Sequence, residues 1–172
     1  AIAGQVVAIT VTDFMLSFTF YFEACLTIIF LSCLVNLISS VYFRSERRLS
    51  AFKTFLVLSF DLIQISFLLF FSGGISNPFS ILIIVPVIVS ASSLPIVYLI
   101  TLGIMTLLST LLLSVKYFPI IDSSGDILKS PEIFLIGFSA SLIITVTFLG
   151  GYARRIFLDN SNMIRALQAT QV

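Results

Sequence analysis

The sequence predicts an all-α membrane protein, built as a bundle of six transmembrane helices. Of its 172 residues, 59% are hydrophobic and only 10% are charged, whereas a soluble domain has about 25% charged residues. The apolar residues form runs that are long enough to enter a bilayer, and short polar segments separate them. The formal net charge is +1. Without a basic stripe, a nucleic-acid partner is excluded.

The first and last segments of the chain predict a fragment of a longer protein. The first apolar run, residues 1–12, ends at Asp13. Twelve helical residues reach about 18 Å, which is short of a hydrocarbon core about 30 Å thick. We therefore expect a truncated first helix, and the helical pattern at Val172 also stops without a cap. The other five apolar segments are residues 20–43, 51–72, 78–94, 95–117 and 132–152.

The fourth apolar segment is the shortest of these five. Its seventeen residues include Pro86 and would span about 26 Å as an α-helix, the lower limit for a crossing. An uncharged stretch, residues 90–95, joins it to the fifth segment. Six crossings are the prediction, and a re-entrant hairpin made of the fourth and fifth segments is the alternative.

The positions of the cations predict the orientation in the membrane. Basic residues cluster between the second and third segments and again after the sixth, and by the positive-inside rule both clusters are cytoplasmic. An even number of crossings then places both chain ends in the cytoplasm, and the loops at residues 73–79 and 119–131 outside. The basic residues are Arg44, Arg47, Arg48 and Lys53, and then Arg154, Arg155 and Arg165.

The uncharged heptapeptide between the third and fourth segments predicts a tight turn with a ligand site. Glycine ends helices in the left-handed conformation, so Gly73 should close one helix. Asn77 should cap the next helix, with Pro78 in its first turn. Turn chemistry does not explain the apolar Ile75 and Phe79.

These residues together favour a flat, lipid-soluble ligand with two carbonyl groups. Ile75 and Phe79 would flank its ring, and Gly73 and Gly74 would let the backbone approach. The Asn77 amide and the free N–H groups after it would donate hydrogen bonds. A turn with a purely structural role is the alternative.

Four polar residues in the apolar segments are secondary candidates. Asp61 lies mid-segment, where a carboxylate is costly, with Gln64 one turn away on the same face. Asn36 is the predicted partner of Asp61, and Glu23 lies level with the heptapeptide. The alternatives are a neutral Asp61 that fastens the bundle and a Glu23 carboxylate at the membrane surface.

The heptapeptide resembles the GGxxNPF sequence of the RegB/PrrB/ActS family of redox-responsive sensor histidine kinases. Residues 61–64 resemble the family's Asp-x-x-Gln, residues 3–5 its first-helix AGQ, and residues 166–170 the start of its cytoplasmic linker. The resemblance implies a six-helix sensor domain in the bacterial inner membrane that binds ubiquinone at a periplasmic loop. It also implies a homodimer, a phosphorelay to a response regulator, and ATP use confined to a kinase domain beyond this chain.

The resemblance divides the chain into two parts. Residues 1–153 would be the transmembrane sensor domain, and residues 154–172 the start of a coiled-coil linker. The fragment cannot phosphorylate itself, since it has no His and no glycine-rich nucleotide loop. Neither Cys25 nor Cys33 corresponds to the redox-active cysteine of the family, and no metal site is expected.

A transporter or channel is the competing interpretation. It would use Asp61, Gln64 and Asn36 as a path through the membrane. Such proteins commonly have repeated halves with broken helices at matching positions. The sequence has no apparent repeat, although Pro86 would break the fourth helix. An integral-membrane enzyme lacks support, because no nucleophile–base set or paired carboxylates occur in the chain.

Overall fold

The computed structural model describes residues 6, 7, 10, 11, 21–42, 50–121, 127 and 130–170. Over these residues the protein is helical and forms no strand, apart from an isolated bridge between Ile121 and Ile127. The predicted all-α class is confirmed. The α-helices are α2 (Phe22–Tyr42), α3 (Ala51–Phe71), α4 (Val85–Ser93), α5 (Ile96–Val115) and α6 (Glu132–Thr170), and the 3-10 helices are η2 (Gly74–Ser76) and η3 (Pro78–Ile84).

Four helices of the described part are long and apolar enough to cross a membrane. Most of the first predicted segment, all but residues 6, 7, 10 and 11, lies outside the described residues, and the fourth, Pro78–Ser93, is shorter than the others. The predicted count of six crossings is therefore not confirmed. The four candidate spans are Phe22–Val41, Ala51–Phe71, Ile96–Val115 and Glu132–Met163.

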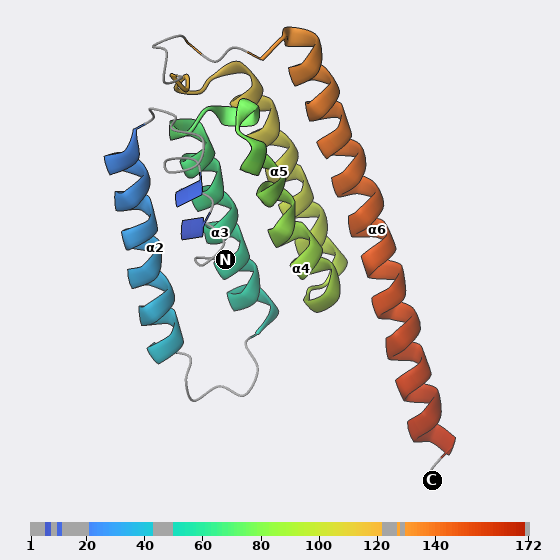
Figure 1. The fold of residues 1–172 in the computed structure, drawn as a ribbon. Helices are drawn as coiled ribbons and strands as arrows, with labels where there is room; N and C mark the ends of the chain where they lie inside the picture. The colour runs from blue at the N-terminus through green and yellow to red at the C-terminus, as the bar shows by residue number, and fades with distance from the viewer. Residues whose placement is uncertain are drawn as a thin grey trace.

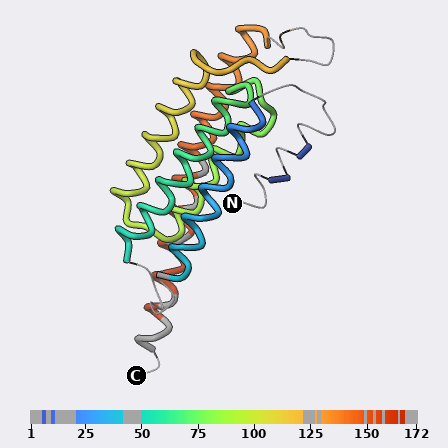
Figure 2. Tube along the Cα trace, turned by 90° about the vertical axis from the view of Figure 1, so that its left-hand side faces the viewer, coloured from blue at the N-terminus to red at the C-terminus, as the bar shows by residue number. Residues whose placement is uncertain are grey.

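The helices lie side by side in one bundle, with their connections at its two ends (Figure 1). The heptapeptide and the segment that leads from α5 to α6 share one end, which we call the loop end. The turn between α4 and α5 lies at the opposite end. There α6 continues beyond the other helices, and Figure 2 shows the same extension from the side. This helix passes through the predicted boundary at residue 153 without a break.

The short fourth segment gains length from its 3-10 portion. A 3-10 helix rises about 2.0 Å per residue and an α-helix about 1.5 Å. Seven residues of η3 and nine of α4 therefore reach about 27 Å together. The segment runs beside α5 from the loop end to the opposite end of the bundle (Figure 1). Pro86 falls in the first turn of α4, where its missing N–H is tolerated.

The main core lies where α3, η3, α4, α5 and α6 meet. Leu62, Ile83, Val87 and Leu102 are almost fully buried there. A smaller cluster of Cys25, Ile29 and Leu68 joins α2 to α3. Apolar side chains also cover the outside of the bundle, as expected where lipid replaces water. Ile133, Val115 and Phe148 are among the most exposed.

Candidate functional site

The heptapeptide forms the tight turn that its glycines and Asn-Pro pair predict. Gly73 and Gly74 have φ angles of 101° and 60°, a left-handed conformation that other residues rarely adopt. α3 ends at Phe71, and Ser72 follows it as the C-capping residue, just before the glycines. Asn77 caps the following helix, and Pro78 is its first residue. The local geometry predicted for this turn is confirmed.

Asn77 holds the turn together from inside. Its Oδ1 accepts a hydrogen bond from the Phe79 N–H at 2.8 Å. Its Nδ2 donates to the carbonyl oxygen and to the Oγ of Ser72, at 2.8 and 2.9 Å. Only 4% of the Asn77 residue is exposed. One amide thereby fastens the end of α3 to the start of η3.

The donors expected to point outward to a ligand are used within the turn. Pro78 has no N–H, Phe79 N–H donates to Asn77 Oδ1 and Ser80 N–H donates to the Asn77 carbonyl oxygen. The expectation of free N–H groups at this helix start is wrong. The physical reason is that the Asn77 cap and the tighter 3-10 hydrogen-bond pattern give these N–H groups acceptors within the protein.

The end of α5 and the segment after it cover the two glycines. A Cβ atom on Gly74 would lie 2.7 Å from both the Leu113 carbonyl oxygen and the Tyr117 Cβ. A Cβ atom on Gly73 would collide with the Ile120 side chain. The Phe118 N–H also donates to the Phe70 carbonyl oxygen at 2.9 Å. The glycines therefore serve to let this covering segment approach the turn.

The predicted ligand residues differ in accessibility. Gly73, Gly74, Ile75 and Asn77 are buried, whereas Pro78 is exposed and Phe79 is half-buried. The six residues lie in one turn, but a ring could reach only Pro78 and Phe79 without displacing the cover. Beside the cover, Phe118 packs with its ring against the aromatic side chains at the loop end of α2 and α3. These are Tyr21, Phe70 and Phe71.

The secondary candidates do not form one cluster. Asp61 is half-buried in α3, and its Oδ1 has no hydrogen-bond partner among the described residues. Gln64 is buried one turn further along α3. Asn36 donates to the Ser32 carbonyl oxygen at 3.0 Å rather than to Asp61, so the predicted pairing is wrong. Glu23 is exposed in the first turn of α2, at the loop end.

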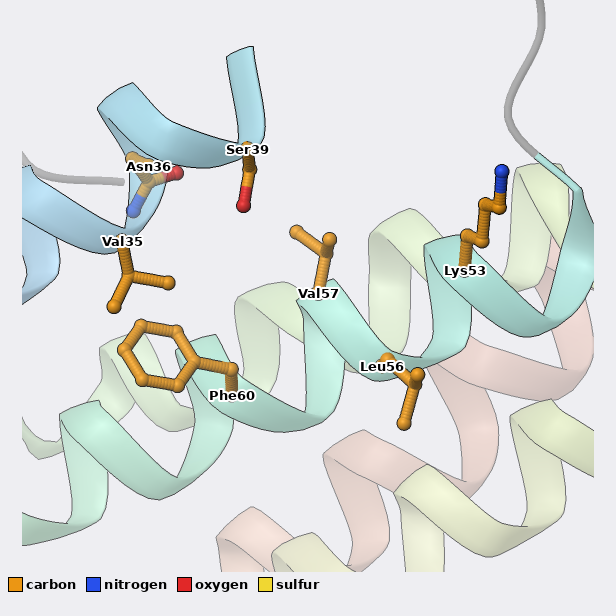
Figure 3. Close-up of a pocket in the computed structure, with 7 residues that line it drawn as sticks. All are labelled: Val35, Asn36, Ser39, Lys53, Leu56, Val57 and Phe60. Carbon is orange, nitrogen blue, oxygen red and sulfur yellow. The ribbon is translucent and has the colours of Figure 1, made fainter. Parts of the chain in front are cut away.

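Asn36 instead lines a small pocket between α2 and α3, with a volume of about 250 Å³. Figure 3 shows Val35, Asn36 and Ser39 on α2 facing Val57 and Phe60 on α3. Lys53 lies at the far edge of this pocket, near the end of the bundle opposite the turn. The pocket is mostly apolar, and Asp61 does not line it.

A larger cavity of about 650 Å³ lies between α5 and α6 at the loop end. Sequence reasoning did not find it, because its walls come from two helices and the loop that joins them. Tyr117, at the end of α5, was the one available signal, since aromatic residues with a polar tip favour the membrane surface. The described residues contain no group of acidic, Cys or His side chains that would hold a metal ion.

Two curated proteins resemble the chain along its whole length. The sensor histidine kinase RegB of Cereibacter sphaeroides is 38% identical over 174 residues, which is 100% of this chain and 37% of that protein. RegB from a further strain of the species is 37% identical over the same coverage. The chain thus spans a little over a third of the length of these relatives. No family model matches the chain, and no solved structure matches it.

Proposed function

The chain belongs to the RegB family of sensor histidine kinases, and from this membership we propose that it is the membrane input domain of a two-component sensor. The ligand it senses is ubiquinone, which binds at the loop end of the bundle. Autophosphorylation by ATP and transfer to a response regulator belong to the length of the protein that this chain does not span. The working unit is a homodimer.

The observation that carries this proposal is the heptapeptide turn at the start of the η3–α4 segment. The turn holds its shape through Asn77, and it presents Pro78 and Phe79 at its surface. An apolar surface beside a fixed backbone suits the ring of a lipid-soluble carrier. A ligand that prefers one arrangement of this turn would shift the population of the whole domain.

The path from the turn to the output follows α4. This helix packs against α6, and a Cβ atom on Gly150 of α6 would lie 3.5 Å from the Val87 side chain of α4. At the far end of α4, the Nη1 of Arg154 donates to the Leu94 carbonyl oxygen at 2.9 Å. A displacement that starts at the turn therefore has a rigid route to α6, the helix that leaves the bundle.

Of the five Lys and Arg residues that the structure describes, four support an orientation with the turn in the periplasm, and Lys116 at the end of α5 lies at the loop end. Lys53 at the start of α3 and Arg154, Arg155 and Arg165 on the outgoing part of α6 lie away from the loop end. Under the positive-inside rule this end is cytoplasmic. The membrane that the domain crosses in this proposal is the inner membrane of a bacterium, and both chain ends lie in the cytoplasm.

Ubiquinone binding tests the proposal directly. The protein is reconstituted in nanodiscs and titrated with ubiquinone-1, a short-chain ubiquinone. Phe79→Ala should weaken binding several-fold, because it removes an apolar contact at the turn. Phe52→Ala, an exposed aromatic residue at the opposite end of the bundle, is the matched control. If the unmodified protein does not bind ubiquinone-1, the proposed ligand is wrong.

The transporter interpretation keeps one observation in its favour. Asp61 places a carboxylate oxygen without a hydrogen-bond partner in the described structure inside a candidate span, and such residues often mark ion or proton paths. Proteoliposomes loaded with a pH indicator would test it. A proton flux that Asp61→Asn abolishes would favour transport over sensing.

A further inference from the structure

We infer that the ubiquinone head group binds in the cavity between α5 and α6, beside the heptapeptide turn rather than on its backbone. This inference rests on the proposed function and names the binding site within the loop end. The cavity volume of about 650 Å³ falls in the usual range for ligand pockets, roughly 300–1,000 Å³. The lining residues are Leu111, Ser114, Val115, Tyr117, Ser130, Glu132, Leu135, Ile136, Ser139, Ala140 and Ile143.

The polarity of the cavity changes along its length. Tyr117, Ser130 and Glu132 line it at the loop end, where α5 stops and α6 begins. Ala140 and Ile143 line it further along α6, and Ile143 lies about 16 Å from Glu132 along the helix axis. A molecule with a polar head and an apolar chain fits this order, with its chain directed into the membrane.

The polar groups of the cavity favour a neutral head group. Hydroxyl groups of Tyr117, Ser130 and Ser139 can donate to carbonyl oxygens. Ser139 is buried, and its Oγ has no hydrogen-bond partner within the described part of the chain. An unsatisfied buried hydroxyl is costly. Because this oxygen is closed off from the cavity, a ligand carbonyl could accept its hydrogen bond only after a small movement of the wall. The Glu132 carboxylate would repel a phosphate, which disfavours an anionic phospholipid head.

The cavity communicates with the heptapeptide through Tyr117. This residue forms part of the cavity wall and also packs directly on Gly74. A side chain at position 74 would push the wall away, since its Cβ would meet both Tyr117 and the Leu113 backbone. The glycine therefore couples the wall to the turn. A ligand that displaces Tyr117 would therefore also press on the turn that leads into η3 and α4.

Narrowing the cavity from either wall is the test. Ala140→Leu adds side-chain volume on α6, and Ser114→Leu adds it on α5. The matched controls are Gly137→Leu and Leu112→Phe, which are neighbours on the same helices outside the lining. Apart from its chain neighbours and its own helix backbone, no heavy atom lies within 4 Å of a Cβ at Gly137, and Leu112 is 68% exposed. All variants are reconstituted in nanodiscs, checked for helix content by circular dichroism, and titrated with ubiquinone-1.

The two cavity variants should bind ubiquinone-1 at least about tenfold more weakly, a loss of about 1.4 kcal/mol, and the two controls should bind as the unmodified protein does. If one cavity variant fails to fold, the other decides. Normal binding by a folded cavity variant, with a loss in Phe79→Ala, would overturn the inference and leave the proposed function standing. Absence of ubiquinone-1 binding in the unmodified protein would overturn both.

Discussion

Replacing Asn77 with Ala should destabilise the domain by about 3 kcal/mol. The side chain makes three hydrogen bonds, one to the Phe79 N–H and two to Ser72. Each bond contributes about 1 kcal/mol, and loss of an N-cap alone costs about 0.5–2 kcal/mol. Because Asn77 and Ser72 are buried, water cannot readily replace the lost partner. The main effect of the substitution is therefore on the stability of the turn and not on contacts with a ligand.

The buried thiol of Cys25 provides the assay. Cys25 is fully buried between α2 and α3, whereas Cys33 is exposed. In a Cys33→Ala background, a thiol-reactive dye reports unfolding as Cys25 becomes accessible. Unfolding in mixed micelles with increasing dodecyl sulfate then gives the difference in free energy between Asn77→Ala and the Cys33→Ala parent.

Ser76 offers a control in the same turn. Its Oγ is buried without a hydrogen-bond partner in the described part of the chain, so Ser76→Ala removes a polar group that gains nothing from burial. We expect Ser76→Ala to be at least as stable as its parent, with a gain of about 1 kcal/mol. A similar absence of destabilisation in Asn77→Ala would refute the role assigned to its three hydrogen bonds.

Three more outcomes follow from the same contacts. Gly74→Ala should lower the free energy of unfolding by about 2 kcal/mol or more, because φ is 60° and the Leu113 backbone blocks a Cβ. The same unfolding measurement should show no loss of stability for Gly103→Ala, whose Cβ would meet nothing within 4 Å beyond its own helix backbone and chain neighbours. Arg154→Gln should leave ubiquinone-1 binding unchanged but reduce the response of autophosphorylation in the full-length kinase; an undiminished response would exclude this contact from the signalling path. Glu132→Gln should lower the affinity for ubiquinol-1 relative to ubiquinone-1 several-fold, since a carboxylate accepts hydrogen bonds from quinol hydroxyls but donates none to quinone carbonyls. An unchanged ratio of the two affinities in parallel titrations would contradict this role of Glu132.

The sequence predicted what short-range chemistry determines. Two glycines followed by Asn-Pro define a helix end, a cap and a helix start within seven residues, and the structure has all three. The apolar runs likewise predicted the helical class. The 3-10 form of η3 was not predictable, because it differs from an α-helix by one residue in its hydrogen-bond partner and shares its sequence preferences.

Contacts between distant segments limited the prediction of the site. The cover over Gly73 and Gly74 comes from residues 113–120, about forty positions away, and nothing in the heptapeptide indicates it. The same holds for Asn36. Asn36 and Asp61 lie at equal depth in an antiparallel helix pair, which predicted a hydrogen bond between them. The Asn36 side chain instead donates to the carbonyl oxygen of Ser32, one turn earlier in its own helix. Depth constrains position along a helix axis and leaves the direction of a side chain open.

A ligand in the α5–α6 cavity would act on α6 by two routes. Glu132 and Ala140 belong to α6 themselves, so the ligand touches the outgoing helix directly. Tyr117 links the ligand to Gly74, and the segment after that turn reaches α6 again through Val87 and Leu94. Two substitutions distinguish the routes. Gly74→Ala should reduce both stability and ligand binding, whereas Arg154→Gln should leave binding unchanged and interrupt only the second route. A kinase that still responds fully to ubiquinone-1 with Arg154→Gln would therefore assign the signal to the direct contact with α6.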